Sequence, residues 1–138
     1  MIIAHGGLTA EQVKEIESVE NLYLKSLEQK NYIDNSRYDS LFHNTLVKFS
    51  ANGRLTEMIK NITIQSERLR WLSILTPVRL EQAQKEHSEI IAYLKEGNRE
   101  KVCEKITNHL ELTIENYNKI TREDSFESII CSFKEAFK

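Results

Sequence analysis

Apolar residues recur every three or four positions along the chain, which is the spacing of helices that bury one side. Alternation of apolar and polar residues, typical of a half-buried strand, is not evident. The pattern therefore predicts an all-α fold. It is clearest in two successive segments, which contain Leu55, Ile59, Ile62, Leu69 and Leu72, and then Leu80, Ala83, Ile90, Ile91 and Leu94.

Residues that break helices are few, with one Pro and four Gly in the chain. Thr9 and Gln12 fit a capping box, Asn52 and Asn98 suit N-caps, and Pro77 suits a first helical position. We expect an antiparallel bundle of about six helices joined by short loops. The candidate breaks lie at Gly6-Gly7, Ile33-Asp34-Asn35, Asn52-Gly53, Thr76-Pro77, Gly97-Asn98 and Arg122-Glu123-Asp124.

Length and composition narrow the class of protein. A chain of 138 residues that is 40% apolar is expected to form a single domain over residues 1–138. Its net charge of −2 disfavours nucleic-acid binding by this chain alone. No apolar run approaches the ~20 residues that span a bilayer, and no signal peptide is recognisable, so we expect a cytoplasmic protein without membrane contact. Cys103 and Cys131 are isolated and are expected to be small core residues or helix-surface residues.

Three histidines and one aspartate are predicted to lie at one level of the bundle. Asp39 and His43 are four residues apart, so their side chains share a helix face. His87 and His109 are equally far from Asn98, so they lie level in an antiparallel hairpin. Reflecting Asp39 and His87 through the turns between them leads to residues 65 and 66, which is one common height.

The apolar neighbours of these histidines indicate that the rings point inward. His87 shares its stripe with Ile90 and Leu94, and Val47 follows His43 by one turn. One such histidine would be read as an ordinary core residue bonded to a backbone carbonyl. Several polar groups at one buried level are costly unless something ligates them. His5, between its small neighbours, is assigned no role.

We therefore predict a metal site in the bundle core. Three imidazoles and one carboxylate suit a divalent first-row ion, with zinc as the default and nickel, manganese or iron(II) as alternatives. The sequence leaves open whether the site is a closed structural one or keeps a position for an added ligand.

The same residues carry a family resemblance. Residues 39–43 read D-S-L-F-H, residues 50–55 read S-A-N-G-R-L, and Glu86-His87, Gly97-Asn98 and His109 follow. Over about residues 9–117 the chain resembles the FCD domain, the C-terminal effector domain of FadR-type GntR transcription regulators. Ala51 and Asn98 depart from the usual Gly and Asp of the family.

The resemblance implies that Asp39, His43, His87 and His109 bind the metal and that a small carboxylate effector often coordinates it. It also implies a homodimer and effector binding by arginines in the stretch that here contains Arg68 and Arg70. Arg68 is the better candidate of the two, and the alternative for it is a surface arginine whose stem packs on Trp71. In the family, DNA is contacted through an N-terminal winged helix-turn-helix. This sequence shows no such domain, so no DNA contact is expected of the chain itself.

Both ends are expected to depart from the family core. The family's first effector-domain helix is reduced to residues 1–5 and should leave an apolar groove. An additional amphipathic helix at about residues 124–137 is expected to cover that groove, either in its own chain or exchanged within a dimer.

The sequence is compatible with three functions. The first is a metal-dependent sensor of carboxylates or organic acids, which is not an enzyme. The second is a hydrolase or isomerase that uses the ion as a Lewis acid and needs a general base; Glu86, beside His87 in sequence, points about 100° away from it around the helix. The third is an interaction module with a purely structural metal.

Overall fold

The described part of the molecule is a bundle of helices. A computed structural model describes residues 7–59 and 76–122, and within these ranges it contains no strand. Its helices are α1 (Ala10–Glu28), α2 (Tyr32–Phe49), α4 (Pro77–Glu96) and α5 (Arg99–Arg122), and residues 53–59 are also helical. None of these helices combines the length and apolarity needed to cross a membrane. The all-α prediction is confirmed for the described residues, whereas a count of six helices is not.

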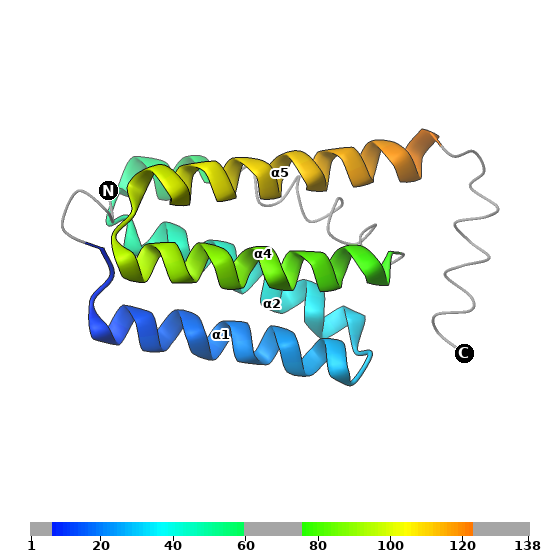
Figure 1. Ribbon diagram of the computed structural model, residues 1–138, viewed down its shortest axis with the longest axis horizontal. Helices are drawn as coiled ribbons and strands as arrows, with labels where there is room; N and C mark the ends of the chain where they lie inside the picture. The colour runs from blue at the N-terminus through cyan, green and yellow to red at the C-terminus, as the bar shows by residue number, and fades with distance from the viewer. Residues whose placement is uncertain (1–6, 60–75, 123–138) are drawn as a thin grey trace.

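The helices pack side by side, and the connections from α1 to α2 and from α4 to α5 are short (Figure 1). Helix α1 packs against both α2 and α4, and α4 packs against α5. Successive helices α1 and α2 run antiparallel, as do α4 and α5, in agreement with the expected topology.

The helices begin at the positions that the predicted cap residues indicated. The Gln12 N–H donates to Thr9 Oγ1 at 3.2 Å, and the Thr9 N–H donates to Gln12 Oε1 at 2.9 Å, which completes the capping box. The side chains of Asn52 and Asn98 each accept from the backbone N–H three residues on, both at 3.1 Å. Pro77 is the first residue of α4.

The break predicted around Ile33-Asp34-Asn35 exists but is misplaced, because it lies at residues 29–31. Helix α1 ends at Glu28 and α2 begins at Tyr32, because the cap is Asn31, whose side chain accepts from the Asp34 N–H at 3.2 Å. Asn35 lies inside α2 and is fully buried, and its Nδ2 donates to Ser26 Oγ at 3.0 Å. The side chain that suggested a turn instead joins α2 to α1.

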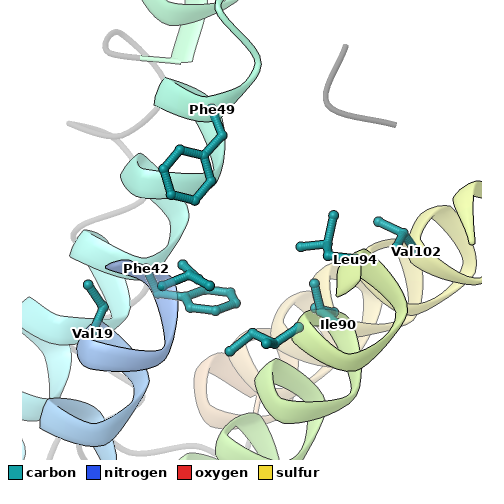
Figure 2. Packing of buried hydrophobic residues seen from close by; sticks show 8 residues of the cluster. Val19, Phe42, Phe49, Ile90, Leu94 and Val102 are labelled. Carbon is teal, nitrogen blue, oxygen red and sulfur yellow. The ribbon is translucent and has the colours of Figure 1, made fainter. Parts of the chain in front are cut away.

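Buried apolar residues from all four of these helices form the core (Figure 2). Phe42 and Ile90 are fully buried, and Phe42 also contacts the polar centre described below. The core therefore fixes the mutual positions of the helices that carry the predicted metal ligands. Its members are Ile16, Val19, Phe42, Phe49, Ile90, Ile91, Leu94 and Val102.

Candidate metal centre

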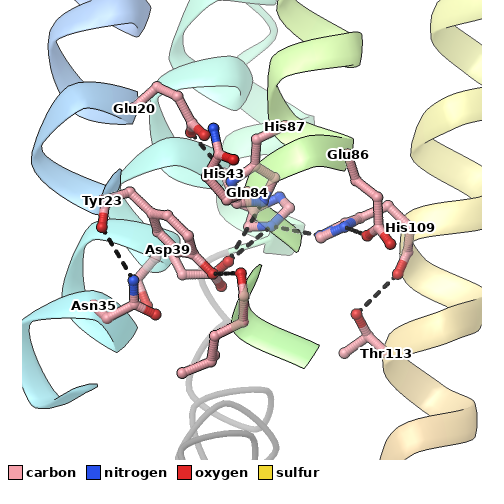
Figure 3. Close-up of polar contacts among 12 residues, drawn as sticks. Glu20, Tyr23, Asn35, Asp39, His43, Gln84, Glu86, His87, His109 and Thr113 are labelled. Atoms are coloured by element: carbon pink, nitrogen blue, oxygen red, sulfur yellow. Dashed lines mark hydrogen bonds and ion pairs between the residues drawn. The ribbon is translucent and has the colours of Figure 1, made fainter. Parts of the chain in front are cut away.

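The four predicted ligands converge in the interior of the bundle (Figure 3). Asp39 and His43 come from α2, His87 from α4 and His109 from α5. Each offers one ligand atom, and these atoms all lie within 4.8 Å of one another. His87 and His109 are buried, and the other two are half-buried. The predicted common level and inward direction are thus found in the structure.

Distances within the cluster fit the ligand sphere of one ion. The Nε2 atoms of His43 and His109 are 3.2 Å apart. Asp39 Oδ1 lies 3.5 Å from His87 Nε2 and 3.8 Å from His43 Nε2. Ligand atoms at ~2.1 Å from one tetrahedral ion would lie about 3.4 Å from each other. These three separations are close to that value, and every pair of ligand atoms lies within 4.8 Å.

His87 is prepared to act as a neutral ligand. Its ring is fully buried, stacks on Phe42 with centroids 3.9 Å apart, and meets the edge of Tyr23. Burial lowers the pKa of His87 to about 3, so the imidazole is uncharged at neutral pH. Neither ring nitrogen has a hydrogen-bond partner among residues 7–59 and 76–122. Buried nitrogens in this state are costly unless they are ligated.

Two glutamates lie behind the histidines, on the side away from the centre. Glu86 Oε2 is 2.6 Å from His109 Nδ1, and Glu20 Oε2 is 3.3 Å from His87 Nδ1. The contact of Glu86 is a hydrogen bond, and a carboxylate in this place accepts the Nδ1–H and leaves the Nε2 lone pair facing a metal. Glu20 lies near His87 Nδ1 without forming a hydrogen bond to it. Glu20 comes from α1 and is itself buried, which raises its pKa to about 8.

Glu86 is held in turn by Arg79 from the first turn of α4. Two Arg79 N–H groups donate to the two carboxylate oxygens of Glu86, each at 2.9 Å. Arg79 also donates to Thr113 Oγ1 at 3.1 Å and to the backbone carbonyl of His109 at 3.3 Å. Burial alone would raise the pKa of Glu86, but the hydrogen bonds from His109 and Arg79 hold it below its usual value. Glu86 is therefore an ionised acceptor.

Sequence reasoning missed these supporting residues. Glu86 does point away from His87, as expected, but that direction leads to His109 on α5. Glu20 shares a helical stripe with Ile16, Val19 and Tyr23, and a glutamate in such a stripe is the signal that could have identified it. The sequence around Arg79 gives no comparable sign of a supporting role. Its partners are Glu86, seven residues further along α4, and His109 and Thr113 on α5.

Several sequence predictions fall outside the described residues. These are the effector-binding role of Arg68 and Arg70, the shortened first helix at residues 1–5, and the additional helix at about residues 124–137. They remain predictions. Cys103 is exposed on α5, as expected of a helix-surface residue.

An antiparallel helical bundle with three histidines and one aspartate gathered in its interior defines the class of protein to which this chain belongs. Residues 4–112 match the model of the FCD domain, so the chain belongs to the FCD domain family and the resemblance is confirmed. FCD domains are typically the effector-binding domains of GntR-family regulators, and they sense ligands rather than catalyse reactions. Comparison with curated proteins found no match, and neither did comparison with solved structures.

Proposed function

We propose that this chain is the metal-dependent sensing domain of a GntR/FadR-type transcriptional regulator and binds a small carboxylate or other organic acid. Asp39, His43, His87 and His109 would hold a divalent ion, with zinc as the first choice. The single observation that supports this most is the convergence of four donor atoms from three helices within 4.8 Å.

The donor set favours an ion that also attracts an anion. Three neutral imidazoles and one carboxylate leave a divalent ion with a net positive charge. A five- or six-coordinate ion would keep positions for oxygen ligands from an organic acid. When bound, the ion supplies Lewis-acid attraction for such an oxygen, and the four side chains supply its position inside the bundle. Arg68 and Arg70 remain the proposed partners for the rest of the effector.

The positions of the carboxylates favour a sensor over an enzyme. A hydrolase or isomerase would need a general base on the guest side of the ion. Glu20 and Glu86 instead contact the Nδ1 side of His87 and His109, away from the common point of the ligand atoms. They are placed to orient ligands rather than to remove a proton from a guest.

Sensing requires that the guest prefer one arrangement of the helices. The proposed ligands join α2, α4 and α5, and Glu20 adds α1 through His87. An effector that completes the ion's ligand sphere would therefore favour one mutual arrangement of these helices. We propose that a homodimer passes this change to a winged helix-turn-helix, and that the chain itself makes no DNA contact.

Metal content is the first test. The protein is purified without added metal and its zinc, nickel, manganese and iron are measured by elemental analysis. Asp39→Asn should lower the occupancy sharply, because it removes the charged ligand. Asp34→Asn is the matched control, since Asp34 also lies on α2 but pairs with Arg37 at 2.9 Å instead. Equal occupancy in both variants and the wild type would overturn the proposal.

Carboxylate binding is the second test. Thermal melts are recorded against a panel of small carboxylates, with and without a chelator. Stabilisation by one carboxylate that disappears on chelation supports the sensor. Turnover of that compound would favour the enzyme. Unfolding on chelation without any response to carboxylates would favour a purely structural metal.

A further inference from the structure

A continuous series of contacts leads from the start of α4 to the proposed ligand on α5 (Figure 3 shows the part from Glu86 to Thr113). Arg79 holds both oxygens of Glu86 at 2.9 Å, and Glu86 Oε2 lies 2.6 Å from His109 Nδ1. The side chain of Arg79 is 7% exposed and that of Glu86 is 20% exposed, so solvent competes little for these bonds. Charge-assisted bonds of this kind are short and directional.

The identity of the protonated ring nitrogen decides whether His109 can ligate. A neutral imidazole has one N–H and one lone pair, and the neighbour of one nitrogen sets the role of the other. Both oxygens of Glu86 accept from the guanidinium of Arg79, so this carboxylate acts as an acceptor and places the hydrogen of His109 at Nδ1. The lone pair is then at Nε2, which lies 3.2 Å from His43 Nε2 in the centre.

Glu86 is itself fixed by contacts on both helices of the hairpin. The planar guanidinium of Arg79 matches both carboxylate oxygens, which sets the plane of the carboxylate as well as its position. Arg79 is anchored on α5 by Thr113 Oγ1 and by the backbone carbonyl of His109. The carboxylate is therefore held at a fixed place relative to the ring that it contacts.

The other buried histidine is oriented differently. His87 stacks on Phe42 with centroids 3.9 Å apart, and its distance to Glu20 is 3.3 Å. The ring of His109 instead contacts the rings of His43 and His87. Its orientation depends more on Glu86 than that of His87 depends on Glu20.

We propose that Glu86, held by Arg79, is a positioning residue that fixes the tautomer and direction of His109 for metal binding. The inference rests on the proposed function, because it concerns the same centre. It predicts that changes at Glu86 alter zinc affinity although Glu86 is not a ligand.

The test compares two substitutions of Glu86. Glu86→Met keeps the length of the side chain but removes the acceptor, and Glu86→Gln keeps one uncharged oxygen. Zinc dissociation constants are measured by competition with a chromophoric chelator. We expect about a 10–100-fold loss of affinity for the Met variant and a smaller loss for the Gln variant. The matched control is Glu89→Gln on the same helix, which pairs with Lys105 at 2.6 Å and should keep the wild-type affinity.

A second readout separates positioning from general stability. In the metal-free protein, the ¹⁵N shifts of the imidazoles report which nitrogen of His109 carries the hydrogen. The wild type should show Nδ1–H, and both Glu86 variants should show a larger share of Nε2–H. If circular dichroism shows that the Glu86→Met variant does not fold, the zinc affinity and the His109 tautomer of the Glu86→Gln variant test the inference.

The outcomes distinguish this inference from the proposed function. Wild-type zinc affinity and an unchanged tautomer in the Glu86 variants, with zinc affinity lost in Asp39→Asn, would overturn the positioning role alone. Wild-type affinity in Asp39→Asn as well would overturn the metal centre and the inference with it.

Discussion

At the scale of single residues, His87 shows how a side chain becomes a ligand through its surroundings. Its ring is enclosed by Phe42 and Tyr23, and burial keeps it neutral. Asp39 Oδ1 lies 3.5 Å from the Nε2 atom of His87, so this nitrogen faces the centre. A neutral ring needs no deprotonation before it binds a cation, so His87 contributes affinity at neutral pH without competition from protons.

Replacement of His87 should remove most of the bound metal. His87→Ala takes away one of four proposed donors and leaves a space between Phe42 and Tyr23 where the ring lay. We expect a sharp fall in metal occupancy by elemental analysis, and the same for His109→Ala. His5→Ala should keep the wild-type occupancy. Equal occupancy in all three variants would mean that the wrong histidines had been chosen.

The height of each ligand could be predicted from the sequence, whereas its supporting contacts could not. The rise of a helix is constant, so equal distances from Asn98 place His87 and His109 level. The contacts of Glu86 depend on how α4 and α5 are rotated about their axes, which counting residues does not determine. The position of a supporting carboxylate relative to its histidine depends on this rotation. For Glu20 that position also depends on how α1 packs against α4.

At the scale of elements, the hairpin of α4 and α5 brings two of the proposed ligands together. Its turn depends on Gly97, which adopts φ 68° at the end of α4, and on Asn98, which caps α5. Gly7 packs against the same end, because a Cβ there would lie 3.1 Å from the Leu94 carbonyl oxygen. The ends of these helices were predicted correctly since Gly and Asn have distinct backbone preferences.

The break between α1 and α2 was less predictable for a related reason. Lys30 adopts a left-handed φ of 53°, although its residue type gives no sign of this conformation. The polar pair Asp34-Asn35 resembled a turn in sequence but lies in the first turns of α2. Local residue types misplace such a boundary when tertiary contacts, here between Asn35 and Ser26, use the polar side chain inside a helix.

Substitution of Gly97 should destabilise the hairpin. An alanine there must keep the left-handed conformation, which costs about 1 kcal/mol of unfolding free energy. Urea unfolding of Gly97→Ala in the presence of chelator measures this loss. Gly53→Ala is the control, because a Cβ at Gly53 meets no atom within 4 Å. Equal losses in the two variants would contradict the importance of the left-handed turn.

At the scale of the whole molecule, the proposed ion would act as a cross-link inside a bundle that is otherwise held by apolar packing. The four proposed ligands are separated by up to 70 positions in sequence, from Asp39 to His109. An unfolded chain does not hold these donors together, so the ion binds the folded state and stabilises it by mass action.

Zinc should therefore raise the free energy of unfolding in a concentration-dependent way. At free zinc 100-fold above the dissociation constant the gain is about 2.7 kcal/mol, and each further tenfold adds about 1.4 kcal/mol. Thermal and urea unfolding at a series of buffered zinc concentrations measure this slope. Asp39→Asn should shift the onset to higher zinc, and Asp34→Asn should not. Stoichiometric zinc binding without any gain in stability would mean that the ion also binds the unfolded chain or lies outside the bundle. The ion would then not join the helices that an effector has to move.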